Sequence, residues 1–396
     1  MELESLYYRL TVPDAAARER LLAAFAHEAD GAAVLHRETA AFAAYGSAAQ
    51  PLFSRLPIPY RVVPQSARTA LLRTLYRRAE RRIGDAAWPR WPVERSLDDA
   101  RASAWAHAAA RGGIVARTPA WPGGRAPLLI THDIDSAADL SRIAPIRALE
   151  REIGVASSFG FVPRLSWPAR AAVEALVDEG CEVYLHDIGH DGRLPYAGPA
   201  AIAAAFETVF REHPWARPLM RGFRAGQLLT SPALRRVVAE WFDYDLSIPD
   251  TERGGPYGDA AGCGTVFPFR DGSLVEIPLT LPQDVYLRHV YGLTAGQALE
   301  MWRRKLDHIV SVGGVAVLNV HPVWVNPARP DMWQAYRTFL AEARGDERLW
   351  ITTPSSVVAA LHALGDAADA DADADAGEDA RAGADALDAL PQSAAG

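Results

Sequence analysis

From residue 128 to about residue 364, short apolar runs alternate with longer segments whose apolar residues recur at helical spacing. The runs predict buried strands, and their alternation with helices predicts a largely parallel sheet with the helices packed outside it. About seven or eight strands favour an α/β fold, a distorted (β/α) barrel, over the alternative of an open doubly wound sheet. The predicted strands are "PLLITHDID", "VASSFGFV", "CEVYLHD", "PLMRGFRAG", "WFDYDLS", "SLVEIPLT", "VAVLNVHP" and "RLWITTPS".

Two segments of different composition flank this predicted barrel domain, which spans residues 126–365. Residues 1–125 are rich in Ala and Arg and carry helical patterns, which predict a helical N-terminal extension. Residues 366–396 are acidic and free of aromatic residues, and we predict a disordered tail because such a segment buries too little apolar area to order itself. We interpret one basic face in the extension as solvated, with an anionic glycan, a lipid headgroup or a partner protein as alternative contacts. This face comprises Arg73, Arg77, Arg78, Arg81 and Arg82.

Composition and charge restrict the classes of partner. With 49% hydrophobic residues, the 396-residue chain can bury a substantial core. Nine of the 49 acidic residues and one of the 41 basic residues follow residue 365, so the net charge of -8 belongs to the tail and the neutral body predicts no nucleic-acid partner. The two cysteines form no metal-type pair and imply no disulfide framework. No apolar run approaches the ~20 residues of a transmembrane segment and the N-terminus is not that of a signal peptide, so we expect a cytoplasmic protein.

The strand that ends in "THDID" carries two aspartates on one face. Because side chains alternate along a strand, Asp133 and Asp135 share a face with Thr131, while His132 points the other way. Two carboxylates spaced in this way suit a metal ligand beside a general base. We interpret His132 as a packed, hydrogen-bonded histidine rather than a ligand.

Further polar residues follow other predicted strands. His186 and His190 in "HDIGH" are four positions apart, a spacing at which both imidazoles can reach one metal ion if the segment turns. Arg224 could orient a carboxylate through a bidentate contact or form an ordinary salt bridge. His321, at the end of "VLNVH", could be an acid that titrates near neutral pH or a buried structural histidine. In an α/β barrel, chemistry is built at the carboxyl ends of the strands, where all these residues fall.

The order of these motifs from residue 128 to about residue 364 resembles that of the polysaccharide deacetylases, which carry the chitooligosaccharide deacetylase homology domain. "THDID" is similar to the first motif of the family, "HDIGH" to its two-histidine metal motif, "GFRAG" to its arginine motif and "NVHP" to its leucine-histidine motif. The stretches "YDLSIPDT", "SLVEIPLTLPQD" and "LWITTPSSVV" further resemble a branch linked to bacterial exopolysaccharide synthesis.

The sequence departs from the family pattern at three places. Ile134 separates two aspartates that are adjacent in better-studied members, a separation that also occurs in some branches of the family, and "GFRAG" lacks the usual proline of the arginine motif. No clear Asp-x-x-Asp-Trp motif is present, so the residue that would tune His321 is unassigned. Asp245 and Glu276 are the candidates.

The resemblance implies a barrel of the glycoside hydrolase and deacetylase type. It also implies a metal-dependent hydrolase that removes acetyl groups from an N- or O-acetylated sugar or polysaccharide, its carbohydrate substrate. The implied metal ligands are Asp135, His186 and His190, and the implied catalytic residues are Asp133 as base, Arg224 as the group that keeps the base ionised, and His321 as acid. The ion is most simply Zn²⁺, with Fe²⁺ or Co²⁺ as alternatives. Two other functions stay open: hydrolysis of other non-peptide C–N bonds, as in an allantoinase-like enzyme, and carbohydrate binding without catalysis in a glycan assembly pathway.

Overall fold

The computed structural model describes residues 121–253, 260–271 and 273–363 throughout, residues 90–96, 98 and 99, and scattered positions before residue 111. The predicted tail over residues 366–396 lies outside the described residues. Most of the predicted helical extension over residues 1–125 lies outside them as well, including Arg81 and Arg82 of its basic face. Both therefore stay predictions.

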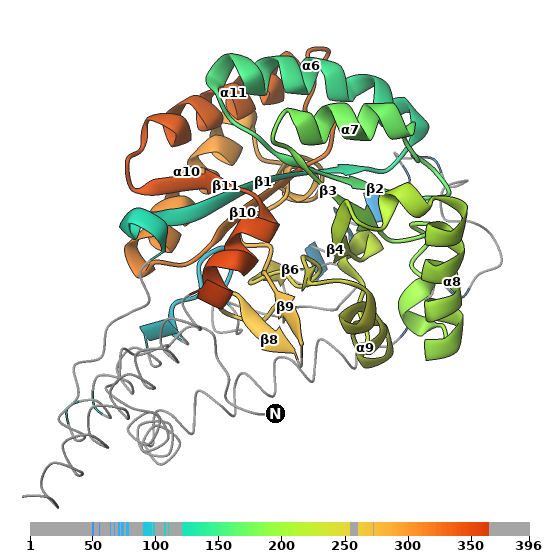
Figure 1. The fold of residues 1–396 in the computed structure, drawn as a ribbon. Helices are drawn as coiled ribbons and strands as arrows, with labels where there is room; N and C mark the ends of the chain where they lie inside the picture. The colour runs from blue at the N-terminus through green and yellow to red at the C-terminus, as the bar shows by residue number, and fades with distance from the viewer. Residues whose placement is uncertain are drawn as a thin grey trace, which may run out of the picture.

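Within the described residues, nine strands form one sheet that curls into a half-barrel with helices packed around it (Figure 1). The strand order is β10-β1-β2-β3-β4-β5-β9-β8, β11 also pairs with β1, and only β8 runs antiparallel to its neighbour. This architecture confirms the predicted distorted barrel. The strands are β1 (Ala126–Ile134), β2 (Ser158–Phe161), β3 (Glu182–His186), β4 (Met220–Arg224), β5 (Tyr244–Asp245), β8 (Phe269–Asp271), β9 (Leu274–Glu276), β10 (Ala316–Val320) and β11 (Leu349–Thr352), and β6 (Glu252–Arg253) and β7 (Ala260–Ala261) pair separately.

The helices follow the strands in the order that the sequence predicts for a (β/α) fold. Their apolar faces cover the sheet because each helix repeats its apolar residues at helical spacing. A last helical segment covers residues 354–363. The named helices are α6 (Ala137–Ile153), α7 (Arg170–Asp178), α8 (Pro199–Glu212), α9 (Pro232–Trp241), α10 (Ala295–Val312) and α11 (Pro330–Gly345), with a π-helical turn at Tyr286–Val290.

Strand β1 is central because three strands pair with it. Strand β10 pairs with residues 128–132 of β1, β11 pairs with residues 126–129, and β2 pairs with residues 131–134. All nine residues of β1 are buried, as expected for a strand covered on both faces. The polar end of β1 is therefore held in the interior, where its side chains need partners.

The segment that follows β9 runs beside β10 and narrows the gap in the barrel. The backbone N–H of Leu281 donates to the carbonyl of Val317 at 3.0 Å. The Thr280 hydroxyl donates to the carbonyl of Val315 at 2.9 Å and accepts from the N–H of Val317 at 2.8 Å. This pairing carries residues 282–284 to the carboxyl end of β10.

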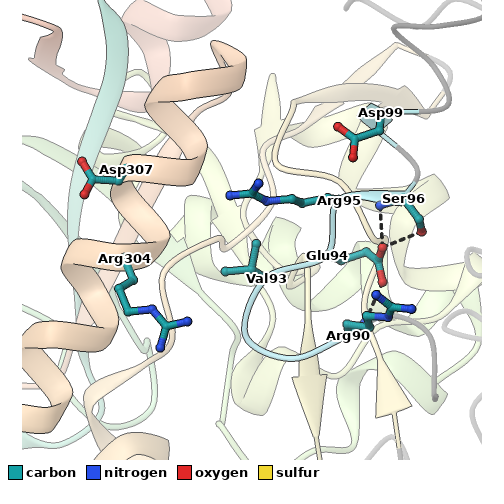
Figure 2. Close-up of a pocket in the computed structure, with 8 residues that line it drawn as sticks. All are labelled: Arg90, Val93, Glu94, Arg95, Ser96, Asp99, Arg304 and Asp307. Atoms are coloured by element: carbon teal, nitrogen blue, oxygen red, sulfur yellow. Dashed lines mark hydrogen bonds between the residues drawn. The ribbon is translucent and has the colours of Figure 1, made fainter. Parts of the chain in front are cut away.

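Residues 90–99 are fixed to the barrel by a buried lysine on α10. The Lys305 ammonium, which is fully buried, donates to the carbonyl of Pro92 and pairs with the Asp250 carboxylate. A pocket of about 630 Å³ lies between this segment and α10, and the side chains of Arg95 and Arg304 point into it from opposite walls (Figure 2). Its wall includes three arginines and three carboxylates, so it has no net charge that would select a ligand. The lining residues are Arg90, Val93, Glu94, Arg95, Ser96, Asp99, Arg304 and Asp307.

We predict that Gly160→Ala lowers the free energy of unfolding by about 1–3 kcal/mol, a typical cost of overpacking a core. Gly160 lies opposite Tyr184 in the sheet, and a Cβ at Gly160 would lie 2.3 Å from a carbon of the Tyr184 ring. Urea unfolding followed by circular dichroism measures the change. The matched control is Gly296→Ala in α10, where a Cβ meets nothing within 4 Å and stability should hold or rise slightly. Equal stability of the two variants would contradict the packing argument.

Candidate active site

The side chains singled out by the sequence lie together at the carboxyl ends of the parallel strands. Strand β1 carries one aspartate near its end and is followed by the other, β3 ends with a histidine, β4 ends with the arginine, and a histidine follows β10. Parallel strands bring their carboxyl ends to one edge, so residues distant in sequence meet there. The residues that the structure brings together are Asp133, Asp135, His186, His190, Arg224 and His321.

Asp135, His186 and His190 could hold a metal ion, because one potential ligand atom of each lies within 4.8 Å of the others. Asp135 Oδ1 lies 3.3 Å from His186 Nε2 and 3.5 Å from His190 Nε2. Two tetrahedral ligands that bind Zn²⁺ at about 2.0–2.1 Å lie roughly 3.4 Å apart, which fits this spacing. Asp135 Oδ1 and His186 Nε2 are buried and have no hydrogen-bond partner among the described residues. Both atoms are thus available to a cation.

The surroundings of the three residues favour their role as ligands. His186 Nδ1 lies 3.0 Å from the backbone carbonyl of Arg224, and donation of its N–H to that carbonyl leaves Nε2 with a lone pair for a metal. The Asp135 side chain is 29% exposed, so an ion at this site would be accessible to water and substrate. A closed structural site would lack that access.

The turn after β3 presents the second histidine. Asp187 and His190 have left-handed φ values of 57° and 50°, a conformation that costs roughly 1–2 kcal/mol for a residue with a Cβ. Gly226, after β4, allows this turn to approach closely: a Cβ there would lie 2.3 Å from Asp187 Oδ2 and 3.1 Å from His190 Cδ2. Packing therefore explains the second glycine of "GFRAG", because any side chain at Gly226 would collide with this turn.

Asp133 is buried, with 2% of its surface exposed, and three side chains donate to it. Oδ1 accepts hydrogen bonds from Arg224 Nη1 at 2.9 Å and the Tyr184 hydroxyl at 2.7 Å, and Oδ2 accepts one from Asn319 Nδ2 at 2.8 Å. Burial alone would raise the pKa of Asp133, but Arg224 and then the nearby histidines hold it well below its usual range. Asp133 is therefore ionised at neutral pH. Its Oδ2 lies 3.6 Å from His186 Nε2, beside the three possible metal ligands.

His321 directs Nε2 towards both aspartates, 3.9 Å from Asp133 Oδ2 and 4.0 Å from Asp135 Oδ2. On its other side, Nδ1 lies 2.7 Å from Asp284 Oδ1, and the backbone N–H donates to Asp284 Oδ2 at 2.9 Å. Burial alone would lower the pKa of His321, but the Asp284 carboxylate, followed by those of Asp135 and Asp133, raises it to about 10. The ring is therefore protonated at neutral pH and carries a proton on Nε2.

The residue that tunes His321 is Asp284, so both candidates from the sequence are wrong. The Asp245 carboxylate accepts from the Ser247 hydroxyl, and Glu276 Oε1 accepts from a backbone N–H of the loop after β5 at 2.8 Å. Asp245 and Glu276 lie on β5 and β9, whereas Asp284 reaches the site because the chain beyond β9 pairs with β10. No local pattern in the sequence signals that pairing.

Tyr184 and Asn319 also contact Asp133, and the sequence reasoning missed both. Each lies on a strand, two positions before a histidine of the site: Tyr184 before His186, which ends β3, and Asn319 before His321, which follows β10. Because side chains alternate along a strand, residues two apart share a face. Extending that rule to "EVYLH" and "VLNVH" would have identified them.

His132 faces the other side of the sheet, as alternation predicts. It is fully buried, and its Nε2 lies 2.7 Å from Glu150 Oε1. The Tyr336 hydroxyl donates to the same carboxylate oxygen at 2.6 Å. His132 is a packed, hydrogen-bonded residue and not a ligand of the site.

The chain is similar to solved structures. A protein assigned as a polysaccharide deacetylase from Mycobacterium smegmatis is 21% identical, with a TM-score of 0.51 over 62% of this chain and 93% of that one. The Puue allantoinase is 17% identical (TM-score 0.49, 63% and 95% covered), as is a protein assigned as a polysaccharide deacetylase from Pseudomonas aeruginosa PAO1 (TM-score 0.48, 64% and 96% covered). No protein-family model matches the chain, and no curated protein does. Of the described helices, none has the length and apolar character to cross a membrane.

We predict that the purified chain binds one divalent ion per molecule and that His190→Ala lowers the affinity at least 10-fold, because it removes one of three ligands. Equilibrium dialysis against Zn²⁺ with elemental analysis measures this. The control is His213→Ala, since His213 packs against Trp167 and Trp215, away from the site, and its loss should leave metal binding unchanged. Identical affinities in the two variants would refute the ligand assignment.

Proposed function

We propose that the protein is a metal-dependent hydrolase that removes acetyl groups from an N- or O-acetylated carbohydrate. The observation that carries the proposal is the arrangement of an ionised carboxylate, Asp133, and a protonated imidazole, His321, beside a possible metal site. Hydrolysis of an amide or ester needs a base for the attacking water and an acid for the leaving group, and both are present in the required protonation states.

Asp133 serves as the base in this proposal. Its charge is maintained by Arg224, and three donors fix its orientation. Asp135, His186 and His190 would hold the ion. A divalent ion bound there would polarise the acetyl carbonyl and acidify the attacking water.

His321 serves as the acid. With Nδ1 engaged by Asp284, its Nε2 is the atom that can give a proton to the departing amine or alcohol of the sugar. Asp284 then stabilises the orientation of the ring through both a side-chain and a backbone contact. The acid and the base approach within 3.9 Å, so one bound substrate group can contact both.

Two observations support the proposal of a carbohydrate substrate. The order of the sequence motifs resembles that of polysaccharide deacetylases, and the M. smegmatis protein that shares the fold is assigned to that activity. The three stretches that resemble the exopolysaccharide branch favour a polysaccharide over a free sugar. We propose Zn²⁺ as the ion, because two imidazoles and one carboxylate with an exposed side suit it.

We predict that Asp133→Asn lowers acetate release from acetylated chito-oligosaccharides at least 10³-fold, because the amide cannot take up the proton. An enzymatic acetate assay on metal-loaded protein measures the rate. The control is Asp243→Asn, a surface residue paired with Arg221, which should retain full activity. Acetate release at the same rate from wild type and Asp133→Asn, or none from wild type, would reject the proposal.

We predict that Asp284→Asn moves the alkaline limb of the pH–rate profile to lower pH. The acid form of His321 is lost as pH rises through its pKa of about 10, and removing the carboxylate that raises this pKa brings the loss to lower pH. Initial rates from pH 6 to pH 11 measure the limb, with Asp243→Asn again as control. An unchanged limb with a merely lower plateau would contradict the role of Asp284.

A further inference from the structure

Two consecutive residues in the segment after β9 support the proposed site: one contacts the acid, and the other contacts a residue that donates to the base. Asp284 holds His321, and Gln283, next to it, contacts Asn319, which donates to Asp133. Asn319 and His321 are two positions apart and face the same way. Gln283 contacts the first of them and Asp284 the second. Gln283 has no role in the mechanism above.

The hydrogen bonds of Asn319 determine which way the Gln283 amide points. Arg224 Nη1 can only donate and lies 3.0 Å from one amide atom of Asn319, which is therefore Oδ1. The Asp133 carboxylate can only accept, so the other amide atom is Nδ2. The second N–H of Nδ2 points at Gln283, at 3.2 Å, and the atom that receives it must be Oε1.

The amide nitrogen of Gln283 is consequently directed away from Asn319. This nitrogen makes no hydrogen bond to any described residue. Gln283 is only 5% exposed, yet its amide nitrogen still reaches solvent. The residue is bonded to the Asn319 that holds the base and adjoins the Asp284 that holds the acid, so a nearly buried donor that still reaches solvent here is poised to bind a ligand, since its two N–H groups otherwise meet only water.

We propose that Gln283 Nε2 donates a hydrogen bond to an oxygen of the sugar that carries the acetyl group, which makes Gln283 a substrate-binding residue. The inference rests on the proposed function. Hydroxyl and carbonyl oxygens of a sugar accept such a bond, and the rigid contact through Asn319 fixes the donor relative to Asp133. Gln283 thus selects an acetylated sugar over an acetyl group on an arbitrary alcohol.

The test compares wild type with Gln283→Met, which keeps the size of the side chain and removes both its free donor and the Oε1 that accepts from Asn319. On acetylated chito-oligosaccharides, KM should rise about five- to ten-fold, the effect of one neutral hydrogen bond, with kcat within about two-fold. On 4-nitrophenyl acetate, which has the acetyl group but no sugar, both constants should stay unchanged. The control is Gln334→Met, an exposed residue of α11, which should behave as wild type on both substrates.

A second measurement does not depend on turnover. Saturation-transfer NMR on the full chain without added metal measures binding of N-acetylglucosamine oligomers, and Gln283→Met should weaken it by the same factor. The proposal is overturned if Gln283→Met binds and hydrolyses the sugar like wild type. It is also overturned if the activity of the variant falls equally on the sugar and on 4-nitrophenyl acetate, because Gln283 would then act only on Asp133, through Asn319. Wild type that binds the sugar through Gln283 but releases no acetate would reject the proposed function and retain this inference.

Discussion

Asp133 holds a full negative charge where little water reaches it, and the arrangement around it depends on that charge being compensated. A buried carboxylate without partners is so unfavourable that it would take up a proton. Arg224 supplies the opposite charge at 2.9 Å, itself fully buried, and losing either member of such a pair costs about 3–5 kcal/mol. Tyr184 and Asn319 donate two further hydrogen bonds to the carboxylate.

This requirement connects elements that are distant along the chain. Arg224 comes from β4, Tyr184 from β3 and Asn319 from β10, so the charge on β1 is compensated only when all four strands are in register. Gly160 of β2 provides the space that the Tyr184 ring occupies. A buried polar network with an unpaired member is costly in free energy, so these side chains are held in one arrangement and the carboxyl edge of the sheet is rigid. Rigidity there is what a site with a fixed base, acid and metal ligands needs.

Much of this arrangement follows from two regularities of the sequence. Apolar runs marked all eight predicted strands, because a strand buried on both faces is mostly apolar. Alternation placed Asp133 and Asp135 on one face and His132 on the other, and the same rule extends to Tyr184 and Asn319. The convergence of His186, Arg224 and His321 followed from their positions at strand ends, since parallel strands finish at one edge.

The sequence by itself determined which residues could do chemistry, because residue type and strand periodicity are local properties. Tertiary structure decided which of them act on each other. Asp284 rather than Asp245 or Glu276 holds His321, because an irregular segment beyond β9 pairs with β10, and such long-range pairing has no local signature. The orientation of Gln283 was fixed in the same way, by a chain of donors and acceptors that begins at Arg224 and runs through Asn319. Hydrogen-bond direction depends on the partner, and only folding brings the partner into place.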